Sequence, residues 1–163
     1  MTYVNHIGNT RYIFDRSMPV VSIYQAQRGL AATAMVGVVA LELGLRGTAK
    51  MTVTYEITAY KQGTGDAQVL STPALLQVMQ QATMDALEGN LPKGTITAGL
   101  RINLDHLIGM EIGATVHAEA TLTRMEGRRL IFESEVTSGD DIVGIGRIIR
   151  VMIDEETFLT RLS

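Results

Sequence analysis

One amphipathic helix followed only by strands is the pattern that most constrains the fold of this chain. The helix start is predicted at Ser71-Thr72-Pro73, because a hydroxyl side chain before a proline is typical of a first helical turn. Apolar residues then recur at spacings of three and four, which predicts a single buried face. These residues are Leu75, Val78, Met79, Ala82 and Ala86. Glycine and proline soon after residue 87 end the helix.

Strands are predicted on both sides of this helix. Before it, residues 48–60 alternate between apolar and polar side chains, which is typical of a half-buried strand. The strands predicted after the helix cover residues 95–107, 115–124, 128–136 and 142–153, and a short helix over 155–162 follows them. A sheet with one helix on one face keeps open edges, and a second copy of the chain is the usual cover for such edges, so we expect a dimer.

The first 44 residues carry no functional signature. They are either an extension of unknown role or sequence upstream of a later start such as Met51. The most apolar run, residues 30–41, is shorter than the roughly 20 apolar residues that a membrane span needs, and Glu42 follows it. We therefore expect a buried or docking helix there and no membrane association. Residues 45–163 form the second predicted unit.

Composition excludes several classes of function. The chain of 163 residues has no cysteine, which removes disulfides, thiolate metal ligands and cysteine nucleophiles and fits a reducing compartment. Its histidines, His6, His106 and His117, are too scattered to predict a zinc site. A formal net charge of −3 without a basic block argues against nucleic-acid binding. With no targeting signal visible, we predict a cytoplasmic protein without a metal ion.

Four segments, taken in order, resemble a known family. They are residues 69–75 (VLSTPAL), 99–107 (GLRINLDHL), 126–130 (EGRRL) and 154–159 (DEETFL). Together they resemble the fluoroacetyl-CoA thioesterase-like branch of the hotdog thioesterases, over residues 45–163. The resemblance implies an α+β hotdog fold, in which a curved antiparallel sheet wraps a long central helix. It also implies a homodimer, or a dimer of dimers, with the active site at the subunit interface.

The resemblance also implies an activity and its residues. The activity is hydrolysis of a small or medium acyl-CoA thioester to the free acid and CoA, with no cofactor other than the CoA of the substrate. The family pattern has a threonine at the helix start, a glutamate two turns along and a histidine on the next strand. The threonine falls on Thr72 and the histidine, the implied base, on His106, while Gly99 matches a glycine near the thioester. The glutamate position is Gln80, which can orient a group but cannot accept a proton.

The chemistry of the reaction supports these assignments independently. Thioester hydrolysis needs a nucleophile, a base and hydrogen-bond donors for the oxyanion. A helix start offers unpaired N–H groups, which suits Ser71 and Thr72 for the carbonyl oxygen, and histidine is a base near neutral pH. Arg128 and Arg129 follow a hairpin turn and could bind the phosphates of CoA.

Each of these residues also has a purely structural interpretation. Thr72 could serve only as a helix cap, His106 as a surface residue of a strand, and Gln80 as a solvated or interface residue. Gly99 could merely relieve crowding in a curved strand, and the two arginines could be solvated. His117 alternates with apolar neighbours, and we expect it in solvent.

The glutamine at position 80 leaves two functions open. One is a thioesterase, since losing a general base typically costs about 10²–10⁴-fold in rate and activity can survive this loss. The other is a non-hydrolytic acyl-CoA-binding protein. A dehydratase or hydratase on the same fold has less support, because no second group for proton abstraction is visible. The acyl group is not specified, since the flexible Met79 and Met84 could line a tunnel of any length.

Overall fold

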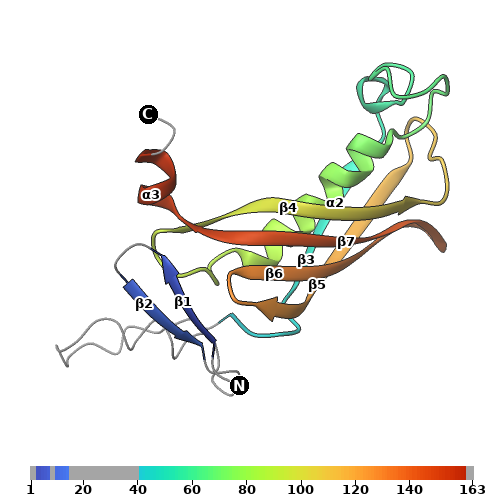
Figure 1. Cartoon of the computed structure of the whole chain (residues 1–163). Coiled ribbons are helices and arrows are strands. Elements are labelled where there is room, and N and C mark those ends of the chain that lie inside the picture. The colour runs from blue at the N-terminus through green and yellow to red at the C-terminus, as the bar shows by residue number, and fades with distance from the viewer. Residues whose placement is uncertain (1–2, 8–9, 15–40, 161–163) are drawn as a thin grey trace. The chain divides into compact units, whose positions relative to one another are not determined.

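The protein forms two compact units, Met1–Ala40 and Leu41–Ser163. The computed structural model describes residues 3–7, 10–14 and 41–160. In the first unit, β1 (Tyr3–Ile7) and β2 (Thr10–Phe14) pair in antiparallel fashion (Figure 1). The helix predicted over residues 30–41 falls outside the described residues except for Leu41, its last residue. The role of the first 44 residues stays a prediction.

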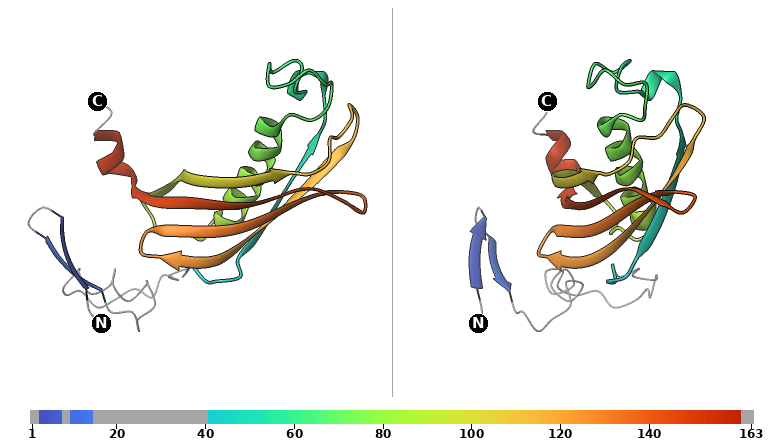
Figure 2. Two further views of the ribbon diagram at one scale, coloured as in Figure 1. Left: turned by 45° about the vertical axis from the view of Figure 1, so that its right-hand side comes forward. Right: turned by 90° about the vertical axis from the view of Figure 1, so that its right-hand side faces the viewer.

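The second unit is a five-stranded antiparallel sheet with one long helix on it. Its strands are β3 (Arg46–Thr52), β4 (Thr95–His106), β5 (Thr115–Glu126), β6 (Arg129–Ser138) and β7 (Asp141–Asp154). Their order in the sheet is β3-β5-β6-β7-β4, so that β3 and β4 are the edges. The sheet curls around α2 (Thr72–Leu87), and the short helix α3 (Glu155–Thr160) follows β7 (Figure 2). The predicted α+β architecture is confirmed.

The strand predicted over residues 48–60 is the main error of the sequence interpretation. β3 begins at Arg46 and ends at Thr52, and a 3-10 helix, η1 (Tyr55–Ile57), replaces the rest of the predicted strand. The reason is a local competition for hydrogen bonds. The Thr58 hydroxyl donates to the Tyr55 carbonyl at 2.8 Å and accepts from the Lys61 N–H at 3.2 Å, which stabilises a turn that alternation alone does not reveal.

The other strand boundaries lie close to their predicted positions. β4 to β7 begin and end within two residues of the predictions. α3 begins at residue 155 as predicted, and the part of the predicted helix beyond Thr160 lies outside the described residues.

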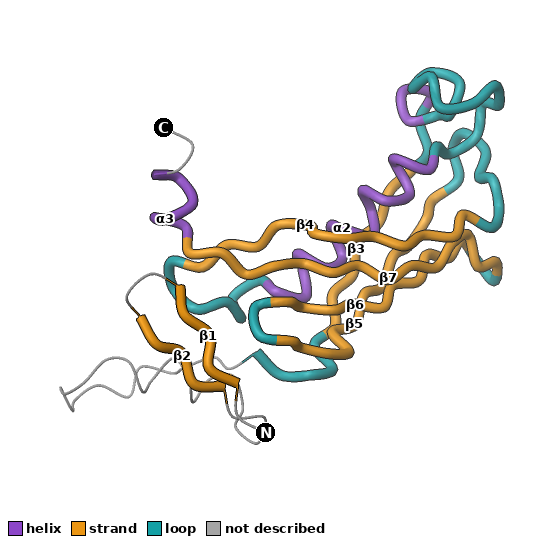
Figure 3. Tube along the Cα trace, in the orientation of Figure 1, coloured by secondary structure: helices purple, strands orange, loops and turns teal. Residues whose placement is uncertain are grey.

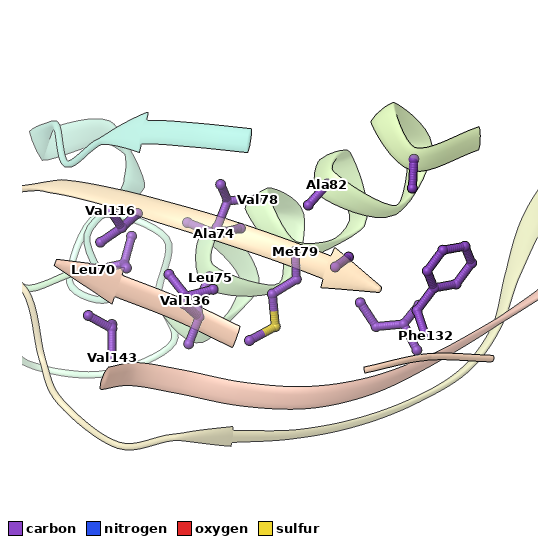
Figure 4. Close-up of a cluster of buried hydrophobic side chains, with 14 of the residues drawn as sticks. Leu70, Ala74, Leu75, Val78, Met79, Ala82, Val116, Phe132, Val136 and Val143 are labelled. Atoms are coloured by element: carbon purple, nitrogen blue, oxygen red, sulfur yellow. The ribbon is translucent and has the colours of Figure 1, made fainter. Parts of the chain in front are cut away.

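The core lies between α2 and the inner face of the sheet. All five residues of the predicted helix face are buried. They pack with inward residues of the strands, among them Val116, Phe132 and Val136 (Figure 4). His117 is exposed between the buried Val116 and Ala118, as expected. At full burial an aliphatic or aromatic side chain contributes about 1.5–3 kcal/mol, so this layer accounts for the position of α2.

The C-terminal half of α2 contacts the β3 edge closely. A Cβ on Gly47 would overlap backbone atoms of Ala82 and Ala86, so only glycine permits this approach. The Thr48 N–H donates to the Asp85 carboxylate at 2.8 Å and ties the same end of the helix to the strand. The helix is thereby fixed along its axis relative to the sheet.

Candidate active site

The first turn of α2 and the last residue of β4 meet at one end of the sheet. The loops that precede α2 and follow β4 both lie at this end (Figure 3). They are joined there, because the Leu70 N–H donates to the Met110 carbonyl at 2.7 Å. As a result the Thr72 Oγ1 lies 3.1 Å from the His106 Nδ1. The two residues that the sequence singled out for the helix start and the strand are therefore in direct contact.

The second nitrogen of the His106 ring determines the direction of this hydrogen bond. His106 Nε2 lies 3.1 Å from the Ile108 carbonyl oxygen, which can only accept. In a neutral imidazole Nε2 must therefore carry the proton, and Nδ1 is left with a lone pair. The Thr72 hydroxyl then donates to Nδ1. This is the arrangement of a hydroxyl or water next to a base that can remove its proton.

Capping of α2 is performed by Ser71 rather than Thr72. The Ser71 backbone is extended, its hydroxyl accepts from the Ala74 N–H at 3.1 Å, and it also donates to the Gln62 side chain. The interpretation of Thr72 as only a cap is therefore wrong. Ser71 is fully buried, and its substrate-binding role stays a prediction.

The Thr72 backbone is also available to a ligand. Within the part of the chain that the structure describes, its N–H bonds to no acceptor. Together with the positive end of the helix dipole, this donor suits a developing oxyanion. The Thr72 side chain is exposed, so donor, hydroxyl and imidazole share an accessible site.

Gln80 and Gly99 form a second cluster with a residue that the sequence interpretation missed. A Cβ on Gly99 would lie 3.0 Å from the Gln80 Oε1, so the bare backbone gives the amide its room. Gly99 pairs across the sheet with Arg150 of β7. Arg150 lies on the same side of β7 as the buried Ile148, and an arginine at an inward position of an apolar strand is the signal that could have identified it.

Arg150 is buried, with only 5% of its surface exposed. Its guanidinium donates to the Thr97 hydroxyl at 3.0 Å, to the Thr97 carbonyl at 3.2 Å and to the Thr83 hydroxyl at 3.3 Å. All three acceptors are neutral. Burial therefore lowers the pKa of Arg150 by removing water from the charged form.

The two clusters are well separated within one chain. Thr72 and Gln80 are eight residues apart on α2, or about 12 Å at 1.5 Å per residue. Gly99 and His106 are seven residues apart on β4, or about 23 Å at 3.3 Å per residue. Gln80 therefore does not orient His106 of its own chain, and the Ile108 carbonyl does so instead.

The remaining predicted residues lie elsewhere. Arg128 and Arg129 are exposed at the β5–β6 turn, and Arg129 pairs with Val151, one residue from Arg150. Their end of the sheet is thus that of Gly99, remote from His106. A hollow of about 1130 Å³ lies on the opposite face of the sheet from α2, is lined partly by Asp105 and His117, and contains none of the predicted site residues. Among the described residues no helix is long and apolar enough to span a membrane.

Comparison with known proteins identifies the family. The family model described as fluoroacetyl-CoA-specific thioesterase matches residues 28–156, most of the chain. The chain belongs to this family. The resemblance stated from four short segments is thereby confirmed, and the family match also includes residues upstream of position 45. No curated protein matches the chain.

Solved structures agree with the family and the fold. A point variant of the fluoroacetyl-CoA-specific thioesterase matches with 26% identity and a TM-score of 0.69, covering 76% of this chain and 96% of that one. A hot-dog-like protein from Thermanaerovibrio acidaminovorans matches with 24% identity and a TM-score of 0.67, over 74% and 89% of the two chains. A thioesterase superfamily member from Thermus thermophilus has 22% identity and a TM-score of 0.68, over 78% and 95%. The hotdog fold is confirmed.

Proposed function

We propose that this protein hydrolyses acyl-CoA thioesters to the free acid and CoA, with His106 as the base and Thr72 at the thioester. The contact between the Thr72 hydroxyl and the unprotonated Nδ1 of His106 is the observation that carries this proposal. Membership of a thioesterase family supports it. So does a relative with 27% identity, a TM-score of 0.67, and coverage of 72% of this chain and 99% of that one, whose structure holds fluoroacetate and CoA.

The proposed chemistry uses protein groups alone. The His106 Nδ1 takes a proton from the Thr72 hydroxyl, or from a water molecule held by it, and the oxygen attacks the thioester carbonyl carbon. The Thr72 N–H stabilises the oxyanion, and the CoA sulfur leaves with the proton from the imidazole. Attack by water gives the free acid directly. Attack by Thr72 leaves its Oγ1 acylated, and a water molecule deprotonated by His106 then releases the free acid and restores the threonine. Because protein groups and water would supply the nucleophile, the base and the oxyanion donor, the proposal requires no metal ion and no cofactor beyond the CoA of the substrate. We place the reaction in the cytoplasm, in keeping with the cysteine-free sequence.

A homodimer is part of the proposal, because one chain separates the two clusters. β4 is an edge strand and is open to a second copy. If two β4 edges pair antiparallel about the midpoint between Ile102 and Asn103, Gly99 of each copy lies opposite His106 of the other. Gln80 would then reach the partner's thioester site. Two such dimers could associate further.

The proposal is tested by measuring the release of free thiol from short, medium and aromatic acyl-CoAs. Turnover that His106→Ala abolishes is the expected result. The alternative function, acyl-CoA binding without hydrolysis, is favoured by the glutamine at position 80. It predicts saturable binding with no thiol release from wild type, and release from Gln80→Glu. If neither protein releases thiol from any substrate, the thioesterase proposal fails.

A further inference from the structure

The first turn of α2 offers a single backbone donor to a ligand. Helix starts usually leave several N–H groups unpaired, but Pro73 has no N–H. The Ala74 N–H donates to the Ser71 hydroxyl at 3.1 Å, and the Leu75 N–H donates to the Ser71 carbonyl at 2.9 Å. Within the described residues, the Thr72 N–H is thus the one donor of this turn without an acceptor. Oxyanion holes commonly combine several donors, so a second donor would come from a neighbouring segment.

The side chain of Gln62 lies against this helix start. It belongs to the loop before α2, and its Oε1 accepts the hydrogen bond of the Ser71 hydroxyl. Ser71 is fully buried, and its Oγ already accepts from the Ala74 N–H. The hydroxyl proton therefore needs an acceptor, which the amide oxygen provides and the amide nitrogen cannot. As a result the oxygen of Gln62 faces Ser71, and its Nε2 carries two N–H donors that this contact does not use.

These donors are accessible at the same end of the sheet as the candidate site. The Gln62 side chain is exposed, as is that of Thr72, the residue after Ser71. The loop that holds Gln62 and the loop that follows His106 lie together at this end (Figure 3). The Gln62 N–H also donates to the Thr58 carbonyl at 3.0 Å. The residue therefore keeps its position even without the Ser71 contact.

We propose that Gln62 donates from Nε2 to the thioester carbonyl oxygen and completes the oxyanion hole with the Thr72 N–H. This assignment rests on the proposed function, because it concerns the same reaction. Side-chain amides are among the groups that stabilise the oxyanion of acyl transfer. The Gln62 amide is held before the substrate arrives, so it does not have to reorganise as the negative charge develops.

Two substitutions separate donation by Gln62 from its contact with Ser71. Gln62→Glu keeps an oxygen for the Ser71 hydroxyl but has no N–H donor, and Gln62→Met removes the donors without adding charge. Both should lower kcat for the best substrate of the thiol-release panel by about 10²–10³-fold, the usual cost of one oxyanion donor, with little change in KM. Gln68→Glu is the matched control, because it adds the same charge at an exposed position of the same loop and should keep kcat. The values are compared at the plateau of the pH–rate profile, where an effect of the new charge on the base is removed.

Failure of this assignment differs from failure of the proposed function. If Gln62→Met keeps the kcat of wild type, or if Gln68→Glu loses as much as Gln62→Glu, the assignment is overturned while the thioesterase activity of wild type stands. Thermal melts show whether each variant is folded, and Gln62→Glu should melt close to wild type because it keeps the Ser71 contact. If one of the two Gln62 variants does not fold, the other decides.

Infrared spectroscopy replaces kinetics if wild type releases no thiol. The probe is acetyl-CoA labelled with ¹³C at the thioester carbonyl, bound to His106→Ala so that it is not consumed. A hydrogen bond from Nε2 should lower the C=O stretching frequency, and adding Gln62→Met should reverse part of this shift. Equal frequencies with and without the Gln62 amide overturn the assignment whether or not the protein is a thioesterase. Failure of acetyl-CoA to bind overturns it as well.

Discussion

The Nδ1 of His106 lies 3.1 Å from the hydroxyl oxygen of Thr72, across 34 positions of sequence. The Ile108 carbonyl holds the other ring nitrogen and makes Nδ1 the acceptor. The proposed hydrolysis requires both residues of this pair.

Removing either partner should reduce turnover without unfolding the protein. For His106→Ala we expect a loss of about 10²–10⁴-fold in kcat, the usual contribution of a general base. Thr72→Val keeps the shape of the side chain but removes the hydroxyl and should give a comparable loss, whereas Thr72→Ser should retain most activity. Thiol release under saturating substrate measures all three variants. Full activity of Thr72→Val would show that the hydroxyl takes no part.

Ser71→Ala should lower the stability of the protein but not its turnover. It removes the hydroxyl that caps α2, and the free energy of unfolding should fall by about 0.5–2 kcal/mol. Denaturant unfolding measures this loss, and the folded variant should keep its kcat. Thr72→Val is the paired control, since it should leave the unfolding free energy nearly unchanged.

Gln80→Glu should raise kcat, by up to about 10²-fold, because a carboxylate can accept a proton and, in the proposed dimer, would reach the thioester site of the partner subunit. Gln81→Glu is the matched control, because Gln81 is the next residue of the helix and is exposed. An equal effect of the two substitutions would indicate a general electrostatic change rather than a specific one.

Gly47→Ala should destabilise the fold severely. The added Cβ would overlap the backbone of α2 at Ala82 and Ala86, and a backbone cannot move aside as a flexible side chain can. We expect a loss of about 3 kcal/mol or more, at the upper end for overpacking. Gly65→Ala is the control, since its Cβ would meet only the Ala59 side chain at 3.4 Å. Similar unfolding midpoints for the two variants would contradict the close packing of β3 on α2.

The start of α3 should depend on pH through Asp154. Its carboxylate accepts from the Thr157 N–H at 2.9 Å, and hydrogen bonds with Thr157 lower the pKa of Asp154 from its ordinary value of 3.8. A lowered pKa in the folded state means that the stabilisation is present above pH 3.8 and is lost as the pH falls through the folded value. The protection factors of the α3 amides, which correct for the intrinsic pH dependence of hydrogen exchange, should therefore fall in acid. Asp154→Asn, which cannot titrate, should show no such change.

Local patterns in the sequence were sufficient for most of the fold. The buried face of α2 and the alternation of Val116, His117 and Ala118 depend on periodicity that a single segment contains. The end of β3 was missed because the Thr58 hydroxyl competes with the strand for backbone hydrogen bonds. No pattern of apolar and polar residues reports such a contact.

The candidate site was predicted in part, and the part that was missed depends on contacts between segments far apart in the sequence. Thr72 and His106 were recognised through a family pattern, and their contact arises from the pairing of two loops. The choice of Ser71 as the cap depends on backbone angles at the helix start. The Ile108 carbonyl has no side-chain signature. The hydrogen bonds of Arg150 to Thr83 and Thr97 form only when β4, β7 and α2 pack together.

The carbonyl of Ile108 has a consequence for how such a protein can change over generations. Every amino acid has a main-chain carbonyl, so no ordinary substitution at residue 108 deletes the acceptor that aligns the imidazole. Ancestors and descendants of this chain can thus exchange the residue at position 80 while the proton acceptor remains in working order. Residue 80 can therefore vary without disturbing the alignment of the imidazole.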